Sequence, residues 1–437
     1  MPPANTPATR APVSTAPGQT PQHRVAAPPT ANRTTDRFQV KREAILAVAA
    51  EEFNRHGLKG VTLASVAERV GLQKASVSYY HRRKEDLAAD CMLQAIAAMQ
   101  GVVQAALTQP SPAQRIHAFL RGQAALLADM ATGRRGALVS FQEVRALAPP
   151  HGDRVAEAYN SLFRSLRQCL PSDPGWQHAH RNARTHLLQT LANGMHTWID
   201  RYEPDDYGHA ADALADLLLG GLAAQPQAWR APAMPELPAL RAAPAQADGS
   251  EVREAFLRAA TALVNEQGFR GASVSAISAR LHLTKGSFYH HHASKDELIA
   301  QCFARSFDVI RQTQLQAMAQ TPSGWERLVT STCALVRFQL SEAGPLLRSS
   351  ARSALAEGAR HDPIQRGNQL TERFGLFIVD GMREGAIRPV DASLAAQQVA
   401  AMVNAAASLR NWVGDVGVDD AVPLYAQPLF TGILTPP

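Results

Sequence analysis

Apolar residues recur at helical spacing through two long blocks of the chain, residues 38–224 and 250–437. In the first block, for example, Ile45, Ala49 and Phe53 share one helical face. Alternation with a period of two, which would predict strands, is scarce in both blocks. Each block is therefore predicted to be all-α.

The two blocks are copies of one another. A shift of 211 positions aligns residues 42–87 with residues 253–298 without a gap, and 15 of these 46 positions are identical. The match returns near the end of each block, where Trp198 and Trp412 are each followed at the same spacing by a pair of aspartates. A period of this length indicates duplicated domains rather than a solenoid.

Capping residues divide the aligned segment into short helices. Gly57 and Gly268 are suited to the left-handed position at the end of a first helix. Thr62 and Ser273 then stand where an N-cap hydroxyl can accept the free N–H groups of a second helix. Before the fourth helix, Ser294 is expected to cap through a capping box.

A third short helix is expected after a tight turn, over residues 74–81 in the first copy and 285–292 in the second. Two short helices joined by such a turn form a helix-turn-helix, whose last helix can enter the major groove of DNA. Val77 and Phe288 are the expected apolar anchors of this helix. Small and polar side chains on its other face are free to meet bases.

These residues carry a family resemblance. The stretch LTKGSFYHHHASKDEL, residues 283–298, closely resembles the signature of the tetracycline-repressor (TetR) family of bacterial regulators. The stretch GLQKASVSYYHRRKEDL, residues 71–87, resembles it too. The resemblance implies in each copy a three-helix DNA-binding head on a larger helical body that binds ligand and dimerises. The first copy departs from the family at Ser78, Gln73 and Arg83.

The second copy also departs from the family pattern, with His282 where the turn prefers glycine. His81 and His292 replace a usual core aromatic residue. These substitutions affect the expected geometry and sequence preference of the heads more than their fold.

The resemblance also implies the residues that contact DNA. Base contacts are expected from Lys74, Ala75, Ser76, Ser78 and Tyr79 in the first copy, and from Lys285, Gly286, Ser287, Tyr289 and His290 in the second. Phosphate contacts are expected from Thr62, Tyr80 and Lys84, and from Ser273, His291 and Lys295. Arg82 and Arg83 give the first copy the more basic edge.

Composition sets the remaining boundaries. Residues 1–37 hold eight prolines and few large apolar side chains, so they are predicted to be a disordered tail, either a solvated one or a basic arm along DNA. Residues 225–249 are rich in proline and alanine and are predicted to be a linker. The predicted domains are a first head at 38–98 with its body at 99–224, and a second head at 250–309 with its body at 310–437.

The net charge of +6 is compatible with a polyanionic partner. No apolar run approaches the roughly 18 residues of a membrane span, so no membrane role is expected. Four well-separated cysteines favour a reducing cytoplasm over a disulfide frame or a zinc site. No catalytic motif is present, and neither an enzyme nor a cofactor is expected.

Several single residues have structural explanations. Cys91 and Cys302 are expected to be buried in the fourth helix of each head, and Trp198 and Trp412 to be core residues of a penultimate helix. Three histidines near Trp176 are expected to be solvated or to cap helices: His178, His180 and His186.

The predicted function is therefore a sequence-specific DNA-binding transcriptional regulator, a repressor by the resemblance, whose operator binding is modulated by a small ligand. The alternative is a ligand-binding or protein-docking module in which one or both heads are degenerate. The expected partners are a double-stranded DNA operator and an unidentified small-molecule effector. The two bodies are expected to form either an intramolecular pseudo-dimer or a homodimer. The sequence names neither the effector nor the operator.

Overall fold

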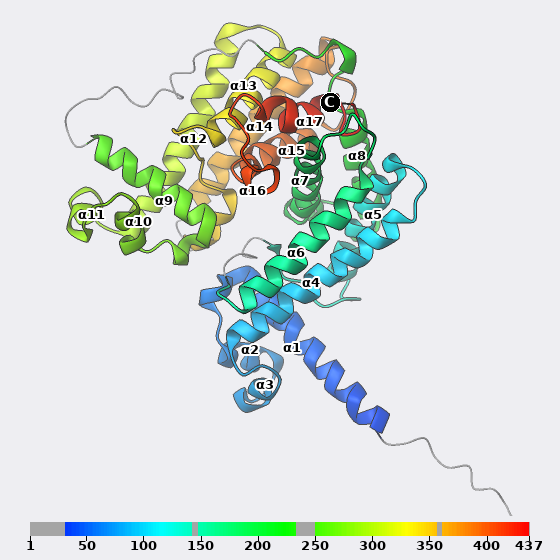
Figure 1. The fold of residues 1–437 in the computed structure, drawn as a ribbon, viewed down its shortest axis with the longest axis vertical. Helices are drawn as coiled ribbons and strands as arrows, with labels where there is room; N and C mark the ends of the chain where they lie inside the picture. The colour runs from blue at the N-terminus through cyan, green and yellow to red at the C-terminus, as the bar shows by residue number, and fades with distance from the viewer. Residues whose placement is uncertain (1–30, 142–146, 233–249, 356–360, 437) are drawn as a thin grey trace, which may run out of the picture. The chain divides into compact units, whose positions relative to one another are not determined.

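A computed structural model describes residues 31–141, 147–232, 250–355 and 361–436 of the chain (Figure 1). Across these ranges every regular element is a helix, and β pairing is limited to one isolated bridge between Ala223 and Ile387. The all-α expectation is confirmed. None of the helices described is long and apolar enough to cross a membrane.

The first repeat begins with three helices and a long fourth one: α1 (Ala31–Gly60), α2 (Leu63–Val70), α3 (Lys74–Tyr80) and α4 (Lys84–Leu107). Its body adds α5 (Pro112–Ala131), α6 (His151–Leu166), the 3-10 turn η2 (Arg167–Cys169), α7 (His178–Gly194) and α8 (Tyr207–Gly220). Helix α4 packs on both α5 and α6, and α5 packs on α8.

The second repeat has the same order. Its head consists of α9 (Ser250–Gly271), α10 (Val274–Arg280), α11 (Lys285–His291) and the start of α12 (Lys295–Gln320). Its body continues with α13 (Gly324–Leu340), η8 (Ser349–Ala354), α14 (His361–Arg383), α15 (Ala392–Ala406), α16 (Arg410–Val413), η10 (Val422–Ala426) and α17 (Gln427–Thr431).

The first helix of each head bends at the predicted glycine. Gly57 has φ 65° and Gly268 has φ 72°, values that glycine adopts without a steric penalty. The helical hydrogen bonding resumes after this bend, so α1 and α9 reach Gly60 and Gly271. The predicted positive-φ positions are thus correct: each glycine is non-helical and interrupts the first helix, and a short helical turn follows it.

Each long fourth helix joins a head to its body, because α4 crosses residue 98 and α12 crosses residue 309 without a break. The heads are sealed against these helices by equivalent contacts. The Cys91 thiol donates to the carbonyl of Leu46 at 3.6 Å, and the Cys302 thiol donates to the carbonyl of Leu257 at 3.5 Å. Both cysteines are buried, as expected. Burial raises the pKa of Cys91 to about 12 and that of Cys302 to about 11.

The structure changes two predicted boundaries, the C-terminal end of the disordered tail and the N-terminal end of the linker. Helix α1 begins at Ala31, so residues 31–37 of the predicted tail are helical. The prolines that prevent a helix end at Pro29, which explains this start. In the predicted linker, Trp229 stacks on Phe430 with ring centroids 5.3 Å apart, because a large aromatic side chain gains more by packing than by staying in solvent. Residues 1–30 and 233–249 lie outside the described part of the chain.

Residues 42–437 pack as one unit, and a single hydrophobic core runs through both bodies. Helix α7 of the first body packs on α15, α16 and η10 of the second, and α8 packs on α17. Because residues 178–194 correspond to residues 392–408 in the repeat, α7 against α15 is a contact between equivalent helices. The two bodies therefore meet through the last helices of each.

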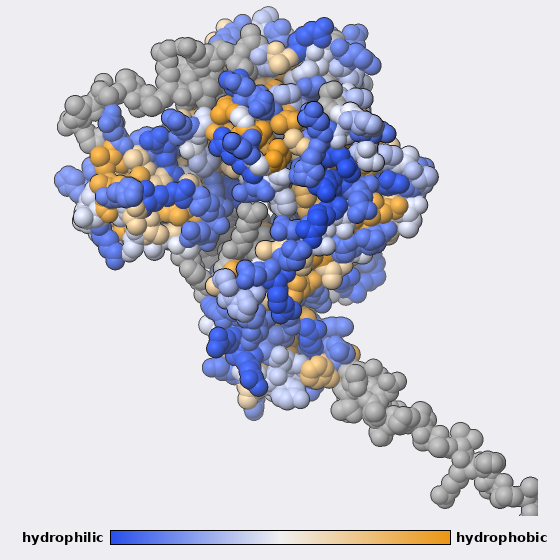
Figure 2. Space-filling view, viewed as in Figure 1, coloured by the Kyte–Doolittle hydropathy of each residue, from blue (hydrophilic) through white to orange (hydrophobic). Residues whose placement is uncertain are grey.

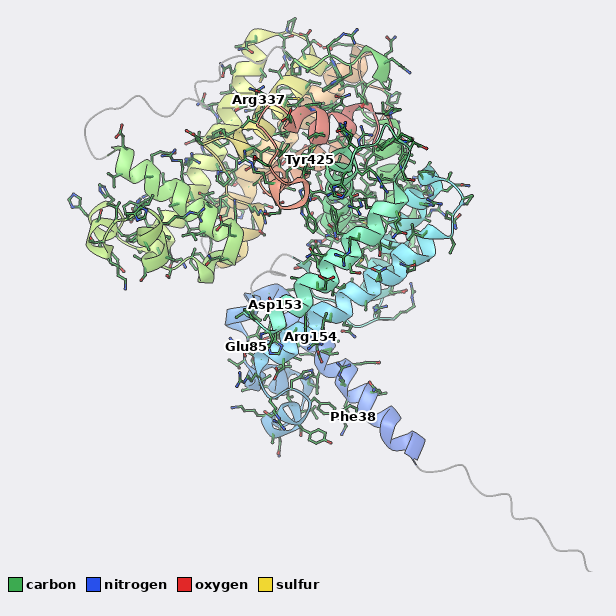
Figure 3. The ribbon with its side chains drawn as sticks, in the orientation of Figure 1. Phe38, Glu85, Asp153, Arg154, Arg337 and Tyr425 are labelled. Carbon is green, nitrogen blue, oxygen red and sulfur yellow. The ribbon has the colours of Figure 1, made fainter. Side chains whose placement is uncertain are left out.

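Aromatic side chains occupy the contact between the bodies. Trp412 stacks on Phe163 of the first body with centroids 3.9 Å apart. His186 stacks at 5.3 Å on Tyr425, which is labelled in Figure 3. Two expectations are corrected here. Trp412 is half-buried on the separate short helix α16 instead of lying in the core of its own body, and His186 is 5% exposed instead of solvated. Both residues are drawn into the contact between repeats, which the pattern within one repeat does not encode.

Polar groups also bind the two bodies together. Asn182 donates to the carbonyl of Trp412 at 2.7 Å. The guanidinium of Arg184, 2% exposed, donates to the carbonyls of Ile433 and Thr435 and lies over the ring of Trp176. Burial lowers the pKa of Arg184 to about 10. This arginine holds the end of the second repeat on the first.

Candidate nucleic-acid interface

The helix-turn-helix of the first head is built by two local signals. Thr62 caps α2, its hydroxyl accepting from the N–H of Ser65 at 3.1 Å while the Ser65 hydroxyl accepts from the N–H of Thr62. Gly71 ends α2 with φ 73°, the left-handed conformation that lets the chain turn sharply into α3. Val77, with 0% exposure, fixes α3 on the core. The predicted anchor is confirmed.

The outer face of α3 carries the predicted base-contact residues. Lys74, Ala75 and Ser76 are exposed, and Tyr79 is 77% exposed. Ser78 is half-buried, so it presents less of its side chain. In the view of Figure 2 the surface over α2 and α3 is mainly hydrophilic. A small, polar, convex helix face of this kind can enter a major groove.

The predicted phosphate-contact residues of the first head also serve the fold. Thr62 is exposed but uses its hydroxyl in the cap of α2. Tyr80 is half-buried with its ring edge-on to Tyr79. Lys84 donates to the carbonyl of Val61 at 3.4 Å. An ammonium has three N–H donors, so this bond leaves others to meet a phosphate. The three residues flank α3, where phosphates would pass.

The second head repeats this frame with different residues. Ser273 caps α10 by accepting from the N–H of Ala276, and Thr284 caps α11, whereas Gln73 makes no such bond in the first head. His282 takes the place of Gly71 and is left-handed with φ 56°, which a non-glycine residue adopts at some cost. The predicted departure at His282 is thus a strained turn.

The exposed face of α11 is more aromatic than that of α3. Lys285, Gly286 and His290 are exposed, Tyr289 is 59% exposed, and Phe288 beneath them is fully buried. Ser287 and His291 are half-buried.

Lys295 is partly used within the second head, because its ammonium donates to the carbonyl of Phe269 and lies 3.9 Å from the centroid of that ring. The capping box expected at Ser294 is only partly formed. Ser294 accepts from the N–H of Glu297, but the Glu297 carboxylate accepts from the N–H of Ala293 rather than from that of Ser294.

Beneath the recognition helices the two heads differ in charge. His81, buried at the end of α3, places Nε2 3.2 Å from Asp90, which also pairs with Arg42 at 2.7 Å. The hydrogen bond with His81, followed by the pair with Arg42, lowers the pKa of Asp90 to about 2. In the second head Gln301 occupies the position of Asp90, and burial lowers the pKa of His292.

The role of Asp90 was not predicted from the sequence. The available signal is that His81 and His292 are equivalent in the repeat, whereas 9 residues further on Asp90 is replaced by Gln301.

An asparagine shared by both repeats joins each head to its body. The Asn54 amide donates to the carbonyl of Leu138 at 3.0 Å and accepts from the N–H of Ser140 at 2.8 Å. Asn265 makes the same two bonds to the loop after α13, at 2.8 and 3.0 Å. Two hydrogen bonds to the backbone fix the orientation of the side chain relative to the loop that it contacts. The same residue, asparagine, stands at this position in both repeats, and that identity is the sequence signal for the contact.

Across the described residues, no group of three or more histidine, cysteine, aspartate or glutamate side chains is arranged to hold a metal ion.

Comparison with known proteins points to one family. The sequence model described as "Bacterial regulatory proteins, tetR family" matches residues 45–91 and 256–302. Each match contains one of the two helix-turn-helix segments described above.

Two curated relatives align over larger segments. The Transposon Tn10 TetC protein of Escherichia coli is 28% identical over 75 residues, 17% of this chain and 38% of that protein, which is less than two thirds of its length. The HTH-type transcriptional repressor DhaR of Mycobacterium sp. (strain GP1) is 26% identical over 139 residues, 31% of this chain and 70% of that protein. Among solved structures, the TetR family transcriptional regulator PfmR from Thermus thermophilus shares 18% identity with a TM-score of 0.32, covering 40% of this chain and 94% of that one.

Proposed function

From the two segments that match the tetR family model, we propose that this chain is a tandem pair of tetR-family units and a sequence-specific repressor of transcription whose operator binding is modulated by a small ligand. The observation that carries the proposal is the pair of third helices, each anchored by a fully buried apolar side chain and each exposing a lysine-led polar face. The name of one relative, a transcriptional repressor, supports repression.

The proposed base contacts come from the exposed faces of the third helices. They are Lys74, Ala75, Ser76, Ser78 and Tyr79 in α3, and Lys285, Gly286, Ser287, Tyr289 and His290 in α11. Phosphates are contacted by Thr62, Tyr80 and Lys84 beside α3, and by Ser273, His291 and Lys295 beside α11. These side chains flank the recognition helices, as positioning contacts do in other helix-turn-helix proteins.

The two repeats act together as a covalent pseudo-dimer. This rests on the continuous core through both bodies and on the pairing of α7 with α15 and of α8 with α17. Because both bodies lie on one chain, their effective concentration is high, on the order of mM for a short linker, which favours internal pairing. The domain divisions proposed are 38–98 and 250–309 for the heads, with 99–224 and 310–437 for the bodies.

Unlike recognition helices require unlike half-sites. The sequence of α3 begins Lys-Ala-Ser-Val-Ser-Tyr, whereas that of α11 begins Lys-Gly-Ser-Phe-Tyr-His. A pseudo-dimer with these two heads reads an imperfect palindrome, and selection of binding sequences from a random DNA pool would return two distinct half-sites. A single repeated half-site would contradict this arrangement.

Salt dependence of DNA binding separates the regulator from its alternative. The test is fluorescence anisotropy of the full chain with the DNA preceding its own gene, against a shuffled duplex of equal length. A regulator prefers the native duplex and loses affinity steeply as salt rises, because bound counterions are released. Absence of preferential binding even at low salt would favour a ligand-binding or protein-docking module with degenerate heads.

Solution mass tests the pseudo-dimer separately. Light scattering of the purified protein, free and on its DNA, is expected to give a protein mass near 47.1 kDa. A stable mass of about twice that value would indicate a homodimer with four heads and would reject the internal pairing as the functional state.

A further inference from the structure

A pocket of about 430 Å³ opens in the first body beside the N-terminus of α5. The charged residues that line it are Arg115, Arg181 and Asp173. It is distinct from the DNA-contacting face, since its walls come from α5, the segment after η2, and α7.

Both arginines at the pocket have their hydrogen bonds to backbone carbonyls only. Arg115 donates to Gln109 at 2.8 Å and to Gln168 at 3.3 Å, and Arg181 donates to Arg167 at 3.4 Å. The Nε of Arg181 is buried and meets no hydrogen-bond partner among the described residues. Neither guanidinium forms an ion pair within the described part of the chain.

Positive charge is in excess around the pocket. Residues 158–172 contain neither aspartate nor glutamate but include Arg167 and Arg164, of which Arg164 pairs with Glu157 at 2.6 Å. Burial, followed by the charges of Arg181 and Arg164, lowers the pKa of Arg167. Two arginines and one carboxylate, Asp173, therefore line the pocket, and Arg167 lies beside it.

The second repeat provides an internal comparison at the same place. Ser111 caps α5 and Ser323 caps α13, and one turn later Arg115 and Arg327 each donate Nε to a backbone carbonyl at 2.8 Å. The two arginines are therefore equivalent in the repeat.

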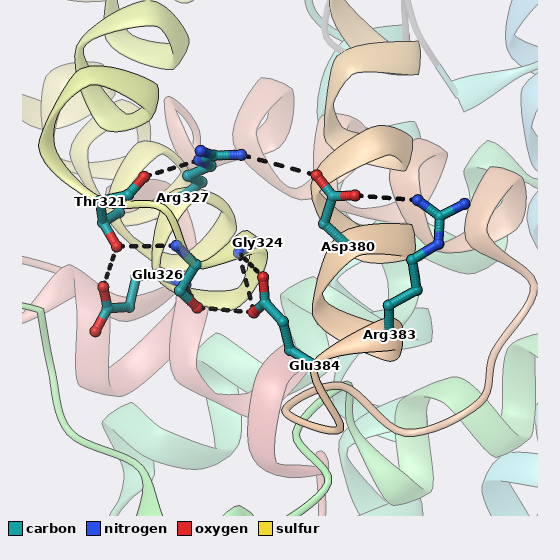
Figure 4. Close-up of polar contacts among 8 residues, drawn as sticks. Thr321, Gly324, Glu326, Arg327, Asp380, Arg383 and Glu384 are labelled. Carbon is teal, nitrogen blue, oxygen red and sulfur yellow. Dashed lines mark hydrogen bonds and ion pairs between the residues drawn. The ribbon is translucent and has the colours of Figure 1, made fainter.

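In the second repeat this place is filled by carboxylates of the chain itself (Figure 4). Asp380 lies 3.7 Å from Arg327. Glu384 accepts from the N–H of Gly324 at 2.8 Å and from the hydroxyl of Ser323 at 2.9 Å. The first repeat has an arginine-lined pocket there instead.

We propose that this pocket binds a small anion through a carboxylate or phosphate group held between Arg115 and Arg181. The ligand supplies from solution the negative charge that Asp380 and Glu384 supply in the second repeat. Guanidinium groups suit this role because their planar N–H donors match both oxyanions. Pro112 has no N–H where Gly324 donates one, so the arginines provide the contacts.

The pocket adjoins the contact between the two bodies. Arg181 donates to the carbonyl of Arg167, whose guanidinium donates to Asn182 at 2.8 Å, and Asn182 donates in turn to Trp412 of the second repeat. Occupation of the pocket therefore acts on a contact that sets how the bodies pair. The consequence for DNA rests on the proposed function, whereas binding of the anion does not.

Calorimetric titration of the full chain tests the site. Inorganic phosphate and citrate are the two probes, with sodium chloride holding the ionic strength constant. Saturable binding of one probe identifies the class of ligand, phosphate or carboxylate. Arg181→Gln and Arg115→Gln are each expected to weaken it by about tenfold or more, since each removes a charged donor.

The controls separate a built site from general attraction. Arg134→Gln, on an exposed arginine paired with Asp129 outside the pocket, makes the same charge change and is expected to leave affinity unchanged. Asp173→Asn, on an exposed loop, is expected to tighten binding several-fold by removing a repulsive charge. A purely structural role for the arginines predicts no such gain.

The proposal is overturned if neither phosphate nor citrate shows saturable binding. It is also overturned if Arg134→Gln and Arg181→Gln lose anion affinity equally. The regulatory arm repeats the DNA titration with each probe at constant ionic strength, in the wild type and in Arg181→Gln. Anion binding without a change in DNA affinity keeps the pocket and rejects only its regulatory role. Loss of DNA binding in every condition rejects the proposed function and leaves the pocket standing.

Discussion

The groups beneath the two recognition helices predict that the second head is the more sensitive to acid. His292 is 1% exposed, and burial lowers the pKa of its ring from the ordinary value of 6.5. Arg253 and His291 nearby also disfavour the protonated ring, and the opposing effects of Glu297 and the neutral Gln301 leave its pKa lowered. In the first head the corresponding His81 faces the carboxylate of Asp90 at 3.2 Å, which can accept from a protonated ring.

The sign and size follow from proton linkage. A histidine held neutral in the folded head takes up a proton when the head opens below pH 6.5, so the open state binds more protons and stability falls as pH falls. Between pH 7.5 and 5.5 the loss has an upper limit of about 1.4 kcal/mol, reached when the folded pKa lies well below 5.5. This corresponds to an increase of up to about tenfold in the opening equilibrium.

Hydrogen exchange followed by mass spectrometry measures this in both heads of one molecule. After correction for the intrinsic pH dependence of exchange, peptides from α9–α11 are expected to lose more protection between pH 7.5 and 5.5 than those from α1–α3. Gln301→Glu gives the second histidine a carboxylate partner and should remove the difference. Asp90→Asn should transfer the acid sensitivity to the first head.

His292→Phe provides the decisive control, because it fills the same space without a titratable group. Acid sensitivity of the second head that survives this substitution would show that the ring is not its source. Equal losses of protection in the two wild-type heads would refute the reasoning at the outset.

Further predictions concern DNA contacts, packing and the contact between repeats. Lys84→Ala should weaken binding to all DNA sequences and reduce the salt slope by about one. The loss should exceed that of Lys295→Ala, because the Lys295 ammonium also lies over the ring of Phe269, whereas Lys84 makes one 3.4 Å bond to Val61. Equal losses in anisotropy would contradict this ranking. Gly324→Ala would put a Cβ 2.5 and 2.6 Å from backbone atoms of α14, so urea unfolding should show a loss of about 1–3 kcal/mol, whereas Gly194→Ala, with open space around it, should not destabilise. Trp412→Ala removes a half-buried stacked ring and should cost about 2–3 kcal/mol in the same assay, and an unchanged midpoint would show that the aromatic contact contributes little.

The heads could be predicted from the sequence because local rules specify them. Thr62 caps its helix through a hydroxyl three residues from the N–H it meets, and Gly71 turns the chain by its own φ. Val77 is recognisable as an anchor because it is the apolar residue of a short polar helix. Each signal lies within a few residues of its effect, so these elements can be predicted without knowing which distant parts of the chain pack on them.

The contacts that the sequence did not reveal join residues far apart in the chain. Asp90 pairs with Arg42, 48 positions away, and Asn182 meets Trp412, 230 positions away. Trp229 is placed in a proline-rich stretch whose composition predicts exposure, yet it packs on the second body. The periodicity of apolar residues indicates which face of a helix is buried. It does not indicate which distant segment packs against that face.

The contact between the bodies has complementary rather than identical sides, which bears on how the duplicated chain assembles. The repeat spacing of 214 that relates Trp198 to Trp412 makes Ala400 the counterpart of His186 and Ala211 the counterpart of Tyr425. Within one chain the ring of His186 lies on that of Tyr425. If two first bodies paired with each other, His186 would face a methyl group and leave a cavity, a loss that the internal pairing avoids. We therefore expect each body to fit the other better than it fits a second copy of itself.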